Sequence, residues 1–126
     1  MNRPLISVIL IAIAVAIGIF SLIYIDKTHE TITVMADEII ESASEDNQAH
    51  TMTLLEKTDK QWDKSKKILN ILIGQQSTNE VKTAIRMAMH FAKLGDMESV
   101  ILYSNEFKVE MEKIKETNEP SWSTIL

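Results

Sequence analysis

The sequence predicts an all-α protein, in which one N-terminal transmembrane helix continues into a small antiparallel bundle of about four helices. Three observations support this fold class. An uncharged apolar segment occupies residues 4–25. Apolar residues then recur at intervals of three and four through the rest of the chain, which is the spacing of amphipathic helices. Helix breakers are scarce, since the 126 residues include only three glycines and two prolines.

The apolar segment, PLISVILIAIAVAIGIFSLIYI, is long enough to cross a bilayer. As a helix it measures about 33 Å, against a hydrocarbon core of about 30 Å. A cleaved secretion signal is the alternative, because Ala14-Val15-Ala16 has the small-x-small pattern of a cleavage site. The apolar sequence continues beyond this triplet to Ile25, which favours an uncleaved signal-anchor that contacts the lipid bilayer through residues 4–25.

Basic residues on the two sides of this segment predict its orientation. Arg3 precedes it and Lys27 follows it. Together with the terminal amine, Arg3 favours a cytoplasmic N-terminus and an extracytoplasmic C-terminal domain under the positive-inside rule. We therefore expect a single-pass protein of the cell membrane. Its predicted parts are the anchor (residues 1–25), a helical bundle domain (26–116) and a C-terminal tail (117–126).

The first helix is expected to leave the membrane and run to about Ser44, where SEDN (residues 44–47) is a turn by composition. Its apolar residues outside the membrane are close to heptad spacing, which leaves open a homodimer through this helix. These residues are Ile25, Ile32, Met35, Ile39 and Ala43.

Three further helices are expected. The second covers about residues 48–73, with Asp59 an imperfection in its apolar face, and GQQSTN (74–79) is the next break. The third covers about residues 79–94. The fourth runs from a cap at Asp96 to about Glu116. The four helices form two hairpins with similar turns, which suggests a duplicated hairpin of tetratricopeptide-like kind within the bundle.

Charge and composition exclude several functions. Since Arg3 is the one basic residue before the apolar segment, the part that follows carries 12 Lys and Arg against 18 Asp and Glu. This acidic balance disfavours nucleic acid and anionic lipid as partners. Cysteine is absent, so disulfides, thiolate metal sites and thiol catalysis are excluded.

No residue pattern predicts catalysis, a metal or another cofactor. His29, His50 and His90 have no second histidine at helical spacing, and no glycine-rich phosphate loop or nucleophile elbow occurs. Asp37 and Glu41 share a helical face, but they lie in a polar run where carboxylates stay solvated. We therefore expect a protein that is not an enzyme.

Two stretches are candidate contact surfaces. KTDKQWDKSKK (residues 57–67) places lysines and a tryptophan on one helix, as a docking surface for an anionic partner or cell-wall polymer would. The structural alternative has the tryptophan in the core, with Glu56–Lys60 and Asp63–Lys67 ion pairs beside it. EPSWSTIL (119–126) ends in apolar residues that would dock on this bundle or on a partner. The candidate partner-binding residues are Lys57, Lys60, Trp62, Lys64, Lys67, Trp122, Ile125 and Leu126.

The overall layout resembles domain-of-unknown-function family 4363, small membrane-anchored helical proteins of monoderm bacteria. The resemblance rests on the Arg3-led membrane helix, the acidic helix after it, Trp62 followed by Lys64, Lys66, Lys67 and ILNILI, the Gly95-Asp96 turn and the terminal Ile125-Leu126. Gln48 departs from the pattern, since an aromatic residue is expected after the first turn. The resemblance implies an anchor and an extracytoplasmic helical domain, and it implies no activity, cofactor or catalytic residue.

These observations predict a membrane-tethered domain that acts by binding a protein partner, as scaffold or accessory subunit of an envelope assembly. The alternative is a ligand-sensing helical-bundle module that signals through a partner protein. Homodimerisation along the first helix would favour this alternative, because signalling needs packed helices.

Overall fold

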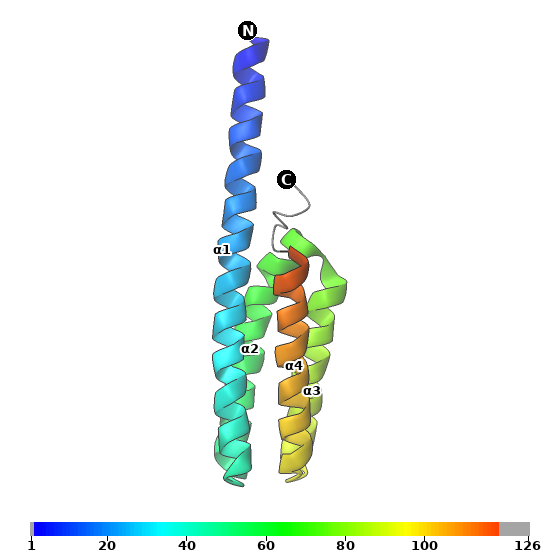
Figure 1. Ribbon diagram of the computed structural model, residues 1–126. Helices are drawn as coiled ribbons and strands as arrows, with labels where there is room; N and C mark the ends of the chain where they lie inside the picture. The colour runs from blue at the N-terminus through cyan, green and yellow to red at the C-terminus, as the bar shows by residue number, and fades with distance from the viewer. Residues whose placement is uncertain (1, 119–126) are drawn as a thin grey trace.

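The computed structural model describes residues 2–118 and is built from four helices (Figure 1). The first helix is far longer than the others and extends beyond them at its N-terminal end. No strand occurs in the described residues, so the predicted all-α fold is confirmed. The helices are α1 (Arg3–Ser44), α2 (Gln48–Ile73), α3 (Gln75–Lys93) and α4 (Met97–Asn118).

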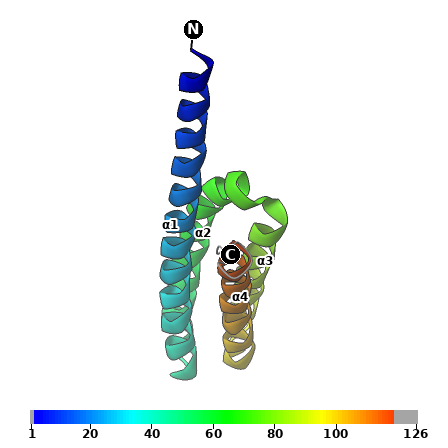
Figure 2. The same cartoon turned by 45° about the horizontal axis from the view of Figure 1, so that its top comes forward.

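The helices close into an antiparallel four-helix bundle. α1 packs against α2 and α4, and α3 packs against the same two helices. Figure 2 shows the four helices arranged around one shared core. The two antiparallel hairpins, α1–α2 and α3–α4, pack into one closed bundle in which α1 lies directly on α4.

The predicted dimer stripe of α1 lies inside this core. Ile25, Ile32 and Ile39 are buried and Met35 is half-buried. They pack with the inward faces of the other helices, because the bundle needs an apolar stripe from each member. Within the chain, this stripe is packed against the other helices of the bundle. The largest fully buried side chains are Trp62, Phe107, Ile32, Ile39, Leu55, Leu69, Ile85 and Met111.

Helix bounds agree with the sequence for the end of α1 and for α2, and they differ for α3 and α4. α3 begins at Gln75 and not at residue 79, because Gly74 alone makes the break. Gly74 has φ 89° and ψ 172°, a conformation that is essentially restricted to glycine. Ser77 consequently lies within α3 and is half-buried. α4 continues to Asn118, two residues past the predicted end.

Three ion pairs join α1 to α4. Asp26 pairs with Lys115 at 3.3 Å, and the His29 Nε2 atom lies 2.6 Å from a Glu112 carboxylate oxygen. Further along α1, Asp37 pairs with Lys108 at 2.6 Å. These cross-helix contacts fix the antiparallel register of the two helices.

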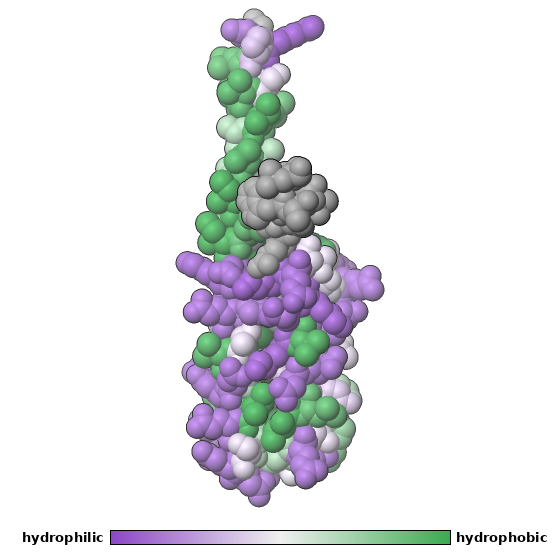
Figure 3. All heavy atoms as spheres, viewed as in Figure 1, coloured by the Kyte–Doolittle hydropathy of each residue, from purple (hydrophilic) through white to green (hydrophobic). Residues whose placement is uncertain are grey.

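The N-terminal part of α1 is exposed and extends beyond the other described helices. One helix near the N-terminus of the described chain is long and apolar enough to cross a membrane, and its most apolar 18-residue window is wholly exposed. In Figure 3 this apolar part projects away from a bundle whose surface is mainly hydrophilic. The bundle therefore lies at one end of a bare apolar helix.

Candidate functional site

Four lysines form a continuous exposed row on the outer face of α2. Lys57, Lys60, Lys64 and Lys67 are spaced by three, four and three residues, so one side of the helix presents them all. We call this row the lysine stripe. It runs along about 15 Å of helix at 1.5 Å per residue.

None of these four lysines forms an ion pair within residues 2–118. The expected Glu56–Lys60 pair does not form among these residues. The expected Asp63–Lys67 pair is also absent, because Asp63 turns to α3 and pairs with Lys82 at 2.7 Å. The stripe is therefore a local positive surface on an acidic chain. Its ammonium groups remain available to an external anion.

Trp62 does not belong to this surface. Its side chain is 0% exposed. The indole Nε1 donates a hydrogen bond of 3.2 Å to the backbone carbonyl oxygen of Thr78 on α3. We therefore correct the prediction that Trp62 contacts a partner. The tryptophan faces inward because α2 buries an apolar stripe on the side opposite the lysines.

The same buried side of α2 includes Asp59, a charged residue that interrupts the apolar face predicted for this helix. Its carboxylate lies 2.6 Å from the Lys82 ammonium and 3.5 Å from the Arg86 guanidinium, both on α3. A nearly buried carboxylate needs such partners, because an unpaired charge in the interior is costly. Asp59 is therefore a contact between α2 and α3 and not a packing fault.

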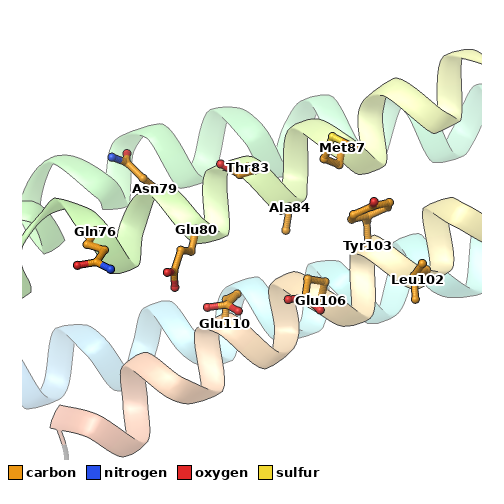
Figure 4. Close-up of a pocket in the computed structure, with 10 residues that line it drawn as sticks. All are labelled: Gln76, Asn79, Glu80, Thr83, Ala84, Met87, Leu102, Tyr103, Glu106 and Glu110. Atoms are coloured by element: carbon orange, nitrogen blue, oxygen red, sulfur yellow. The ribbon is translucent and has the colours of Figure 1, made fainter.

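A groove with a volume of about 710 Å³ lies between α3 and α4. Figure 4 shows the glutamates of the two helices pointing toward each other across it, with Tyr103 and Met87 farther along. No sequence pattern predicts this groove. The four-residue spacing of Glu106 and Glu110 on α4 indicates that these two glutamates share a face. The sequence does not indicate that Glu80, which belongs to another helix, joins them.

The glutamates in the groove alter one another's pKa. A hydrogen bond to Glu110, together with the negative charge of that residue, raises the pKa of Glu80 above its ordinary value. Burial acts to raise the pKa of Glu110, but hydrogen bonds from Lys113, Glu80 and Glu106 outweigh it and lower the pKa. Lys113 lies 3.1 Å from Glu110, and this contact raises the pKa of the lysine. At neutral pH the groove is thus an acidic cluster with one attached cation.

No group of three or more His, Asp or Glu side chains in residues 2–118 is placed to hold a metal ion. The three histidines lie in different surroundings. His29 pairs with Glu112, His50 is exposed next to the first turn, and His90 makes an edge contact with Phe91 at a ring distance of 5.2 Å. The predicted tail contacts Trp122, Ile125 and Leu126 lie outside the described residues.

The fold and these surfaces define a class: a closed four-helix bundle on an apolar N-terminal helix, with a basic stripe and an acidic groove on its outside. The chain belongs to the family described as Domain of unknown function (DUF4363), whose model matches residues 19–125. The resemblance noted from the sequence is therefore confirmed. No curated protein and no solved structure matches the chain.

Proposed function

We propose that this chain is a single-pass membrane protein whose bundle lies outside the cytoplasm and binds an anionic partner. In that role it serves as a scaffold or accessory subunit of an envelope assembly. The observation that carries the proposal is the lysine stripe, whose four ammonium groups have no acidic partner in residues 2–118. Elsewhere in the bundle, Lys82, Lys108 and Lys113 all face carboxylates.

A row of exposed lysines binds through its combined charge. One exposed ion pair contributes about 0–1 kcal/mol, so a single lysine gives little affinity. Four aligned charges over about 15 Å can act together on an extended anion, such as an acidic protein face or a polyanionic wall polymer. Such binding weakens as salt concentration rises, because the screening length falls to about 8 Å at physiological ionic strength.

The apolar helix supports this proposal by holding the bundle beside the membrane. Tethering converts a weak contact with another membrane component into an intramolecular-like event at high effective concentration. A modest surface such as the lysine stripe is therefore sufficient for an accessory subunit.

The proposal is tested by photo-crosslinking in intact membranes. A photoreactive amino acid replaces Lys64 in the full chain, and adducts are compared between the parent and a Lys57→Gln/Lys60→Gln variant. We expect a discrete adduct that is strongly reduced by the substitutions and by added salt. The matched control, Lys66→Gln/Lys93→Gln, removes the same charge away from the stripe and should keep the adduct. An adduct that responds equally to both pairs of substitutions would refute a role for the stripe.

The orientation is tested by cysteine labelling, since the chain has no cysteine of its own. Glu98→Cys is a suitable site because Glu98 is exposed in the first turn of α4. Ser77 belongs to the break predicted from the sequence, but it is half-buried and therefore less accessible to a maleimide. A membrane-impermeant maleimide should label the cysteine in intact cells, and the labelled full-length chain should sediment with membranes. Labelling only after lysis would place the bundle in the cytoplasm and remove the envelope role.

A second candidate function is ligand sensing, which the groove between α3 and α4 favours. Glu80, Glu106 and Glu110 would select a cationic ligand, and Tyr103 offers an aromatic face. A panel of small cations that raises the unfolding temperature of the parent, but not of a Glu106→Gln variant, would support this function. The α1 stripe expected to pair two signalling copies is buried within the chain and lends it no support.

A further inference from the structure

We infer that the corner between α2 and α3 is a second membrane contact, in which Ile68 and Ile71 enter the interface of the bilayer next to α1. The inference rests on the anchor part of the proposed function, namely that residues 4–25 cross the membrane. It adds a fixed depth and tilt for the bundle, which a single flexible tether would not provide.

The depth of the corner in the bilayer follows from the residues of α1 that lie beside it. A groove of about 620 Å³ at this end of the bundle is lined by Ile19 and Leu22 of α1 and by Leu72 and Ile73 of α2. Figure 1 shows the corner reaching up beside α1, short of its N-terminal end. Ile19 precedes Ile25, the last residue of the apolar segment, by six residues, or about 9 Å of helix. Interfacial helices enter a bilayer by about 5–10 Å, so the corner lies at that depth.

The chemistry of the corner fits an apolar environment. Residues 68–79, ILNILIGQQSTN, form the longest uncharged run after the apolar segment, between Lys67 and Glu80. Ile71 is 84% exposed and Ile68 is 38% exposed. A charge at this depth would be costly, whereas exposed isoleucines gain from leaving water.

Charge next to the corner fits a headgroup layer. Lys67 precedes Ile71 by four residues on the same face of α2, so its ammonium group reaches the level of lipid phosphates. The net charge of the chain argues against anionic lipid, but the lysines of α2 present a local positive surface. The rest of the lysine stripe leads away from the membrane, with Lys57 about 24 Å of helix from Ile73.

The corner is also held in a fixed shape. Thr78 bonds to Asn70 across the break and donates to the carbonyl oxygen of Gln75 at 2.9 Å. The Trp62 indole donates a hydrogen bond to the backbone carbonyl oxygen of Thr78 from the interior of the bundle. Because these contacts tie α2 to α3 on their inner side, Ile71 is kept on the outer side.

The test uses the full chain in vesicles of phosphatidylcholine and phosphatidylglycerol, with single cysteines carrying an environment-sensitive fluorophore. Ile71→Cys probes the corner. Leu94→Cys is the matched control, because Leu94 is a similarly exposed apolar residue, at 66%, in the turn at the opposite end of the bundle. Ile17→Cys reports on the anchor. Quenching by a nitroxide lipid and by aqueous iodide is measured for each variant.

We expect the Ile71 probe to have blue-shifted emission and to be quenched by the nitroxide lipid, and the Leu94 probe to be quenched by iodide. If the Ile17 probe is in lipid and the Ile71 probe is in water, this inference fails while the anchor stands. If the Ile17 probe is also in water, the proposed anchor itself fails. An Ile71 probe shielded from both quenchers means that protein covers the corner, and the lipid assignment is overturned. Circular dichroism confirms that each variant retains its helices.

Discussion

The indole Nε1 of Trp62 on α2 lies 3.2 Å from the backbone carbonyl oxygen of Thr78 on α3 and donates a hydrogen bond to it. This bond joins the two helices close to their connection at Gly74, where the chain reverses in a single residue. Trp62, which the sequence presents as a candidate partner-binding residue, thus stabilises the contact between α2 and α3. The lysines on the opposite face of α2 form the exposed surface.

Trp62→Phe should lower the free energy of unfolding by about 1–3 kcal/mol, because it removes a hydrogen bond and part of a fully buried ring. The measurement is urea unfolding of the full chain in micelles, followed by circular dichroism. Leu94→Ala is the control and should change stability by less than about 0.5 kcal/mol, since Leu94 is exposed in the turn between α3 and α4. Equal unfolding midpoints for Trp62→Phe and the parent would contradict the supporting role of the indole.

Asp59→Asn should destabilise the bundle by about 1–3 kcal/mol, because the nearly buried carboxylate accepts from Lys82 and faces Arg86. Asp63→Asn removes a carboxylate from the same lysine at an exposed position and should cost less than about 1 kcal/mol. The same unfolding experiment compares the two variants. Equal losses would show that burial of Asp59 does not matter to the α2–α3 contact.

Glu80 and Glu110 should respond to pH in opposite directions. The pKa of Glu80 is raised by Glu110, so its favourable contribution is present below the ordinary glutamate pKa and is lost as pH rises through the raised value. The pKa of Glu110 is lowered by contacts that include Lys113, so its contribution is present above the ordinary value and is lost as pH falls through the lowered one.

Thermal unfolding at a series of pH values tests this pair. At neutral pH, Glu80→Gln should raise the unfolding temperature because it removes a repulsion, and Glu110→Gln should reduce it because Lys113 loses its partner. The gain from Glu80→Gln should disappear in acid, where Glu80 is already protonated. Shifts of the same sign for both variants at neutral pH would refute the coupled arrangement. Glu56→Gln, on the exposed face of α2, is the control.

Gln48 joins the turn between α1 and α2 to the turn between α3 and α4. Its Nε2 donates to the carbonyl oxygen of Ala92 at 2.9 Å and lies 3.4 Å from that of Lys93, at the C-terminal end of α3. Gln48→Ala should cost about 1 kcal/mol, and Gln48→Glu should cost more, because a carboxylate meets the negative end of the helix dipole. Unfolding in urea gives both values. A Gln48→Glu variant as stable as Gln48→Ala would contradict this geometry.

The position of Gln48 also illustrates what a sequence pattern leaves open. An aromatic residue is expected there from the family resemblance, and nothing local says what a glutamine would do instead. Its partners are more than 40 residues away, at the end of α3. The Glu80–Glu110 contact is hidden for the same reason, since the two residues meet only when α3 and α4 are packed.

The sequence by itself determined the helices and their order. Apolar spacing, the uncharged segment 4–25 and the sparse glycines act within one or two helical turns, so α2 has the predicted bounds and the break at Gly74 is visible. Only the tertiary structure decided which side of each helix faces inward and what its polar residues contact. Trp62 and Asp59 became internal and the lysine stripe remained outside because α3 covers one face of α2, a contact between helices that no local pattern specifies.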